Sequence, residues 1–102
     1  MVEESIGSIK ADLARRVAAI EWRGGPTRIA LEIDQIRAIA RRNAMYPAMV
    51  VAQNLEAALG RGEHGALVHG WLSLLRDAVI SERQDVQAGD TYAAACAVRL
   101  AR

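Results

Sequence analysis

Residues Ala66–Ser81, with the sequence ALVHGWLSLLRDAVIS, carry the strongest helical pattern in the chain. At about 100° per residue, two lines of apolar side chains run along one side of this segment. The first line contains Leu67, Trp71, Leu74 and Ala78, and the second contains Val68, Leu72, Leu75 and Val79. Together they span roughly 160°, which is wider than the ~100° apolar stripe of an ordinary surface helix. The segment therefore predicts a helix at the centre of a bundle, packed against two neighbours.

The rest of the chain predicts further helices, separated by breaks rich in glycine, proline and polar residues. The expected helices are about Glu3–Trp22, a second that opens at Pro26–Thr27 and ends near Arg42, about Pro47–Leu59, and a last helix Thr91–Ala101 capped by Asp90. We expect the central helix to continue to about Gln84. Because helical spacing persists from Ala40 to Leu55, one long helix kinked at Pro47 is an alternative to two separate helices.

Composition and spacing together indicate the fold class. The chain has 102 residues, of which 52% are hydrophobic, and it contains only two prolines and no regular polar–apolar alternation. These features favour one ordered helical domain over disorder or strands. We expect a single domain over residues 1–102, all-α, folded as an up-and-down antiparallel bundle of three to four main helices plus a short C-terminal helix.

Charge and cysteine content narrow the cellular setting. The formal net charge is +1, and the single cysteine, Cys96, excludes an internal disulfide. There is no long apolar run for a membrane span, and the charged N-terminal sequence lacks a signal-peptide core. We therefore expect a cytoplasmic protein without a membrane partner. Twelve of the thirteen basic residues are arginine, which is typical of a GC-rich bacterial genome.

Candidate catalytic and metal-binding residues are few. His64 and His69 are five residues apart, so on one helix they would point in different directions and could not share a metal ion. Cys96 lies between alanines, which is typical of a buried, inert thiol. Ser73 and Ser81 have no nucleophile motif around them, and the glycine-rich stretches match no phosphate or dinucleotide fingerprint. We predict no catalytic residue, no metal, no cofactor and no enzymatic activity.

Three arginines form the clearest candidate for a binding surface. Arg37, Arg41 and Arg42 lie near the end of the second expected helix, and Arg37 and Arg41 share a face because they are four residues apart. Cations at a helix C-terminus also stabilise the helix dipole, so a solvated charged face is the simplest interpretation. Nucleic acid is not the expected partner, because the net charge is small and no aromatic residues alternate with the arginines. Binding of nucleic acid or phosphate through these residues is kept as an alternative.

A second alternative comes from the spacing of Asp34, Ile36, Arg37 and Ala38, followed by Leu55–Glu56. This pattern resembles that of histidine-phosphotransfer domains, which are four-helix bundles of similar length. Their motif has a phosphorylated histidine, then leucine, lysine and glycine two, three and four residues later, and a leucine–glutamate pair further along. Asp34 stands at the histidine position here and Ala38 at the glycine position. The resemblance implies a signalling adaptor with a degenerate phosphotransfer-like surface that cannot itself carry phosphohistidine.

The preferred functional hypothesis is a non-enzymatic interaction module that associates with itself as a homodimer. Ile80 and Val50 fall outside the main apolar stripes of their helices, and Met45 and Met49 flank the break at Pro47. On a monomer these side chains would add to an exposed apolar patch, which small soluble proteins usually keep small. A symmetric dimer would bury that patch, with Ile80 at the expected interaction surface.

Overall fold

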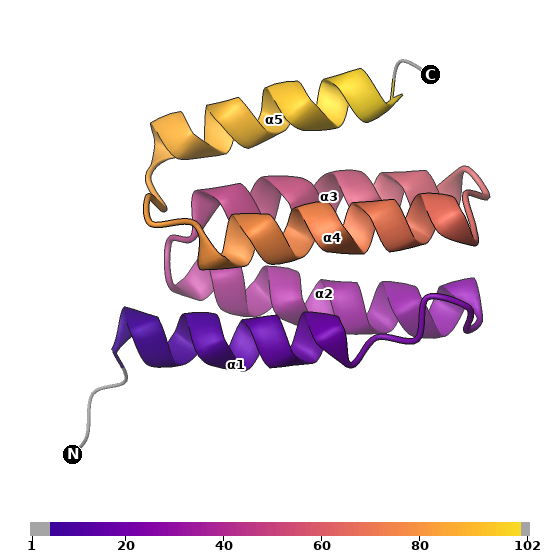
Figure 1. Ribbon diagram of the computed structural model, residues 1–102, viewed down its shortest axis with the longest axis horizontal. Coiled ribbons are helices and arrows are strands. Elements are labelled where there is room, and N and C mark those ends of the chain that lie inside the picture. Colours follow the sequence, from indigo (N-terminus) through magenta and orange to yellow (C-terminus); the bar gives the residue numbers. More distant parts are fainter. Residues whose placement is uncertain (1–4, 101–102) are drawn as a thin grey trace.

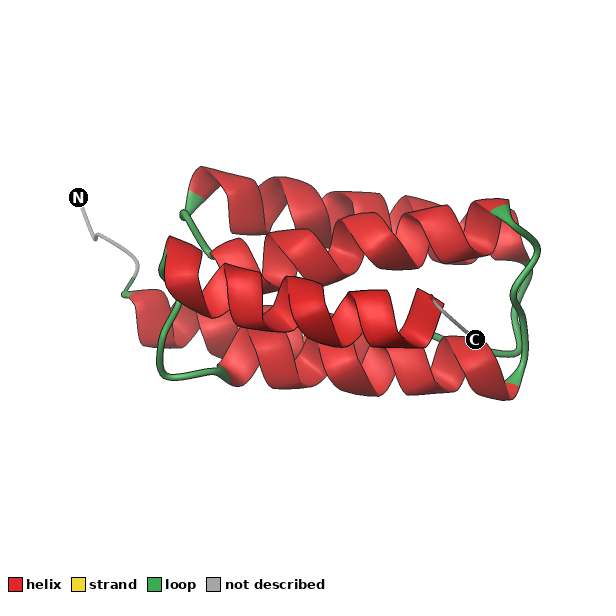
Figure 2. Ribbon diagram, turned by 90° about the horizontal axis from the view of Figure 1, so that it is seen from above, coloured by secondary structure: helices red, strands yellow, loops and turns green. Residues whose placement is uncertain are grey.

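The structure, a computed structural model, describes residues 5–100 and contains five α-helices in that range. They are α1 (Ile6–Ala18), α2 (Pro26–Arg42), α3 (Tyr46–Gly60), α4 (Ala66–Ile80) and α5 (Val86–Leu100). Successive helices run in opposite directions, as Figure 1 shows. Seen from above, their axes are nearly parallel and the connections lie at the two ends (Figure 2). The predicted all-α, up-and-down antiparallel bundle is confirmed.

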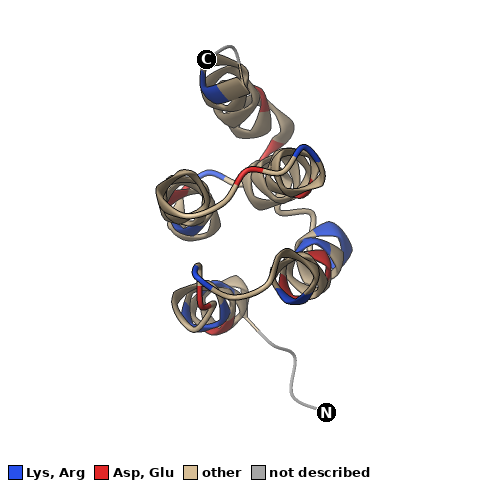
Figure 3. Ribbon diagram, turned by 90° about the vertical axis from the view of Figure 1, so that its right-hand side faces the viewer, with Lys and Arg blue, Asp and Glu red and all other residues tan. Residues whose placement is uncertain are grey.

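The helices form three tiers, with α1 beside α2, α4 beside α3, and α5 alone on the far side of the second tier (Figures 1 and 3). Helix α3 packs against α2, α4 and α5, while α1 packs mainly against α4 and only lightly against α2. Helix α4 thus has the two neighbours that its apolar arc predicts. The helix with the most neighbours is nevertheless α3, so the expectation that Ala66–Ser81 forms the centre of the bundle is wrong.

The two apolar lines of α4 are buried to different degrees. All four members of the second line are buried: Val68, Leu72, Leu75 and Val79. In the first line Trp71 and Ala78 are buried, but Leu67 is 48% exposed and Leu74 is only partly buried. The difference arises because α5 packs on α3 and leaves that edge of α4 uncovered.

Helix α1 is shorter at its end than the sequence predicts. Ser5 is its N-cap, and the Ser5 hydroxyl accepts a hydrogen bond from the Ser8 backbone N–H at 3.2 Å. The helix ends at Ala18 instead of Trp22, yet Ile20 beyond the end is still buried. The apolar stripe therefore continues beyond the end of the helix, because the connection that follows also directs the Ile20 side chain into the core. The predicted start at Glu3 lies outside the described residues.

The break before Pro47 separates two helices. Ala44 has φ of 53°, and the Met45 backbone N–H donates to the Ala40 carbonyl at 2.9 Å, which closes α2 with a left-handed turn. Helix α3 then begins at Tyr46, with Pro47 in its first turn, where a missing N–H costs nothing. The alternative of one helix kinked at Pro47 is therefore wrong.

The region between α4 and α5 differs most from the prediction. Helix α4 ends at Ile80, and the Gln84 amide donates to the carbonyls of Ala78, Val79 and Ser81 instead of continuing the helix. Helix α5 begins at Val86, because the Asp85 carboxylate accepts a hydrogen bond from the Ala88 N–H at 2.8 Å. The predicted cap, Asp90, lies inside the helix. With 15 residues, α5 is as long as α3 and α4.

Candidate functional site

All three predicted arginines, Arg37, Arg41 and Arg42, line one groove between α2 and α3. The groove has a volume of about 810 Å³, and α2 contributes Asp34 and Ala38 to it as well. Helix α3 contributes Met49 and Gln53 from the other side. We call this feature the arginine groove. Ala38 lies between Arg37 and Arg41 along α2, and its small methyl group leaves the space between the two arginines open.

Arg37 is held in place by carboxylates from two helices. Its Nη2 donates to Asp34 Oδ1 at 2.6 Å, and its Nε lies 3.2 Å from Glu56 Oε2 on α3, an ion pair whose angle is outside hydrogen-bond geometry. The Asp34 hydrogen bond and the Glu56 charge raise the pKa of Arg37 further. Burial raises the pKa of the Glu56 carboxyl, against the lowering effect of Arg37. The charge of Arg37 is thus more than balanced within the protein, because the three groups together have a net charge of −1.

Arg41 and Arg42, unlike Arg37, have no carboxylate partner in the part of the chain that the structure describes. Among residues 5–100, neither side chain has an acidic group within ion-pair distance. They do not serve to cap α2 either, because backbone N–H groups of the turn satisfy the carbonyls of Ile39, Ala40 and Arg41. The Asn43 side-chain amide adds a hydrogen bond of 2.8 Å to Ile39. Both guanidinium groups therefore reach the surface without a hydrogen-bonding role in the fold.

The other predicted surface residue, Ile80, is 50% exposed. It lies on the side of α4 that faces away from Leu67 and Leu74, in the same turn as Arg76. Other members of the predicted apolar patch are covered within the chain. Met45 is fully buried, and Met49 and Val50 pack partly against the core. The expectation that Met45 contributes to an exposed patch is wrong, because the turn at Ala44 directs its side chain inward.

A different apolar surface runs along α4 and α5, and the sequence did not predict it. On α4 it consists of Leu67, Gly70 and Leu74, and on α5 of Thr91, Ala95 and Val98. The Arg99 side chain reaches from α5 to α4 here, since a Cβ added at Gly70 would lie 2.9 Å from an Arg99 guanidinium nitrogen. Val98 is 70% exposed. We call this surface the α4–α5 face.

Charge is distributed unevenly around this face. Helices α1 and α2 contain ten charged side chains, whereas α3, α4 and α5 together contain five. Figure 3 shows the charged positions concentrated on the α1–α2 tier and in the loops. The Arg99 guanidinium lies beside Gly70, within the face, and its Cζ is 5.6 Å from the centroid of the Trp71 ring. The α4–α5 face therefore offers mainly apolar and small side chains.

Two smaller hollows have mixed chemistry. Between α1 and α4, a groove of about 360 Å³ contains His69, Ser73 and Arg76 beside Trp22, whose ring packs edge-on against His69 at 5.3 Å. The sequence missed this pairing because the two residues belong to distant segments. His64 precedes α4 and lines a different, smaller hollow, together with Trp22.

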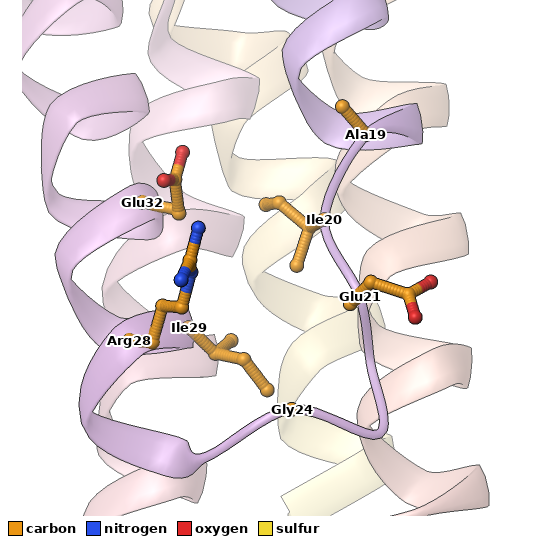
Figure 4. A pocket seen from close by; sticks show the side chains of 7 residues that line it. All are labelled: Ala19, Ile20, Glu21, Gly24, Arg28, Ile29 and Glu32. Atoms are coloured by element: carbon orange, nitrogen blue, oxygen red, sulfur yellow. The ribbon is translucent and has the colours of Figure 1, made fainter.

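The second hollow, of about 480 Å³, lies under the α1–α2 connection and is shown in Figure 4. Ile20 and Ile29 extend into it, and Arg28 and Glu32 lie side by side above them on α2. Because these two side chains have opposite charges, they present little net charge to a ligand. Ser73 and His69 both line the α1–α4 groove, but no hydrogen bond joins them among residues 5–100, as activation of a hydroxyl nucleophile requires.

Other chemistry is limited within the described residues. No group of three or more His, Cys, Asp or Glu residues between 5 and 100 could hold a metal ion. No helix described there is long and apolar enough to cross a membrane. Cys96 is almost completely buried, and burial raises the pKa of its thiol.

We expect the Cys96 thiol to react slowly in the native protein. Burial keeps the thiol protonated and shields it from reagent, so its labelling by a disulfide reagent at neutral pH should be about tenfold slower, or more, than in unfolded protein. A time course in buffer and in denaturant measures this ratio. Equal rates in the two conditions would show that the packing of α5 against α3 does not shield the Cys96 thiol.

Comparisons with known proteins give no match: no family model fits the chain, and neither a curated protein nor a solved structure is significantly similar to it.

Proposed function

We propose that this chain is a non-enzymatic helical interaction module that binds a second copy of itself through the α4–α5 face. The observation that carries the proposal is the exposure of Leu67 and Val98 on adjoining helices. Contiguous apolar surface of this kind is usually covered by a partner. Ala95 is small and permits close approach of another helix, whereas the Arg99 guanidinium covers Gly70.

The low charge of the face favours a second copy as the partner. A strongly charged partner would find little to complement it, because ten of the fifteen charged side chains in the helices lie on α1 and α2. A twofold axis through the face would place small and apolar side chains against their own equivalents. The Arg99 guanidinium beside Gly70 is the charged group that such an isologous contact must accommodate. A cytoplasmic location in a bacterium is part of the same proposal, and a reduced Cys96 is compatible with it.

The mass of the protein in solution tests the proposal. We expect sedimentation equilibrium at micromolar concentration to give twice the 11.0 kDa of one chain. Leu67→Glu should convert the protein to a monomer, because it places a charge in the apolar contact. Ile80→Glu is the matched control: it makes the same change at a similarly exposed apolar position of the same helix, on the opposite side.

Two results would contradict this proposal. A monomeric wild-type protein at these concentrations would exclude self-association. A dimer that Ile80→Glu disrupts and Leu67→Glu leaves intact would move the interface to the Ile80 side of α4. Circular dichroism of each variant verifies that the helices are retained, so that a change in mass reflects the interface alone.

A signalling adaptor is the second candidate, and one observation favours it. Asp34, Arg37 and Glu56, which carry the resemblance to histidine-phosphotransfer domains, lie together on the α2–α3 surface. Such an adaptor would bind the receiver domain of a response regulator without transferring phosphate. Titration of purified receiver domains, with Asp34→Lys as the variant that reverses the local charge, tests this function. Absence of binding across a panel of receivers would exclude it.

A further inference from the structure

We propose that the arginine groove is a binding site for the phosphate group of a small phosphate monoester. This site is separate from the α4–α5 face and does not depend on dimer formation. Arg41 and Arg42 supply the positive charge, and Arg37 borders the same groove with its guanidinium fixed by Asp34 and Glu56. Guanidinium groups suit phosphate because they offer paired N–H donors in one plane.

The adjacent pair Arg41 and Arg42 favours a dianion. Arg37 with Asp34 and Glu56 forms a trio of net charge −1, whereas Arg41 and Arg42 have no acidic partner within ion-pair distance among residues 5–100. A phosphate monoester carries about −1.5 to −2 at neutral pH, whereas each phosphodiester of a nucleic acid carries a single charge. One monoester therefore neutralises this pair.

The distribution of basic residues around the groove favours a small molecule over a nucleic acid. A nucleic acid requires a track of cations along its backbone. The other adjacent arginine pair of the chain, Arg15 and Arg16, is already bound to Asp12 on α1. Arg23, Arg28, Arg76 and Arg99 also have no ion pair among residues 5–100, but they belong to other segments and form no continuous track with Arg41 and Arg42. In the groove, Ala38 and Met49 provide apolar contact for the organic part of a small ligand, and the Gln53 amide provides a polar one.

The groove lies near the C-terminus of α2, where the negative end of the helix dipole repels an anion. Hydrogen bonds to the terminal carbonyl oxygens reduce this repulsion. Backbone N–H groups and the Asn43 amide already occupy the terminal carbonyl oxygens of Ile39, Ala40 and Arg41. The two arginines are therefore not drawn back onto the helix end by hydrogen bonds. Their donors have no acceptor among residues 5–100, and both side chains line the groove in which a phosphate would bind.

The test uses the full-length protein and NMR of arginine Nε–Hε groups. Glycerol phosphate, as monoester, and dimethyl phosphate, as diester, are titrated to about 10 mM, at which a millimolar site is nearly filled. We expect the monoester to shift the Arg41 and Arg42 signals in a saturable way and to bind about tenfold more tightly than the diester. Binding should weaken as pH falls below about 6, the second pKa of the phosphate.

Three variants make the result specific. Arg41→Gln with Arg42→Gln should lower monoester affinity about tenfold or more, whereas Arg15→Gln with Arg16→Gln, the matched pair in the last turn of α1, should leave it within about twofold. Arg41→Lys with Arg42→Lys keeps the charge but loses the planar donors, so its affinity should fall between the two.

The proposal is overturned by any of four results: no saturable shift, equal affinity for monoester and diester, equal loss in the Arg15/Arg16 variant, or binding of a duplex oligonucleotide in preference to the monoester. The Arg41/Arg42 variant should keep the dimer mass of the wild type, because the arginine groove and the α4–α5 face lie on different helices. Failure of phosphate binding and failure of dimer formation can therefore be told apart.

Discussion

Leu75→Ala should lower the free energy of unfolding by about 2–5 kcal/mol, the range for removing a buried leucine side chain. Leu75 has no exposed surface and lies on the buried line of α4, between the packing contacts with α3 and α1. Rigid helix backbones on both sides cannot close the cavity fully, so lost van der Waals contacts add to the lost burial. Urea unfolding followed by circular dichroism measures the change.

Leu74→Ala is the control for this experiment. It removes the same atoms one residue away, but Leu74 is only partly buried, so we expect a clearly smaller loss. The sequence pattern alone would assign Leu74 the full effect, because it belongs to the line that contains Trp71. If Leu74→Ala proved more damaging than Leu75→Ala even in the Leu67→Glu background, where no dimer is expected, α4 would be rotated from its described position.

Gly89→Leu should separate α5 from α3 and destabilise the fold by about 1–3 kcal/mol or more, as overpacking does. A Cβ at Gly89 would lie only 3.0 Å from the Tyr46 Cβ and 3.4 Å from the Tyr46 backbone carbon. The first turns of both helices must therefore move apart. Because Cys96 is shielded in the same helix, its thiol should label faster in this variant. Thermal unfolding and the labelling rate report the two effects.

Gly60→Ala is the matched glycine control. Gly60 is the last residue of α3, and a Cβ there would meet no atom within 4 Å. Alanine is also the better helix former, so we expect no loss of stability and a gain of up to about 1 kcal/mol. Should Gly89→Leu behave like Gly60→Ala, with unchanged melting and unchanged Cys96 reactivity, the close contact between α3 and α5 would not exist.

The sequence predicts most of the fold because apolar spacing depends only on local geometry. The line Val68, Leu72, Leu75 and Val79 is buried as expected, and the break at Asn43–Pro47 lies where proline and its neighbours require it. The sequence does not reveal which neighbour covers which part of an arc. Leu67 is therefore half exposed although its spacing is that of a core residue.

The start of α5 shows why a glycine can mislead. In the sequence, Gly89 beside Asp90 is typical of a break followed by an N-cap. In the structure, Gly89 lies inside the helix because only a residue without a side chain allows α5 to approach Tyr46 so closely. Whether a glycine serves a turn or a contact depends on a partner helix that is some forty residues away along the chain, beyond the reach of a local pattern.

In the candidate sites, too, local spacing is predictable from the sequence, whereas contacts between helices are not. Helical spacing is sufficient to place Arg37 and Arg41 on one face, and they do share a groove. The ion pair between Arg37 and Glu56 depends on how α3 packs beside α2, and it decides which arginines are available to a ligand. The α4–α5 face likewise exists only because of where α5 docks.

The packing of α1 has a consequence for the order of events during synthesis. Helix α1 leaves the ribosome first, but the helix that chiefly covers it, α4, begins only at Ala66. Until then Ile9, Leu13 and Val17 have little to bury against, since α2 offers α1 only slight contact. An amphipathic segment whose apolar side is not yet covered can be bound by chaperones or cut by proteases. We therefore expect nascent chains stalled before α4 to be degraded at α1, and chains stalled after it to be protected there.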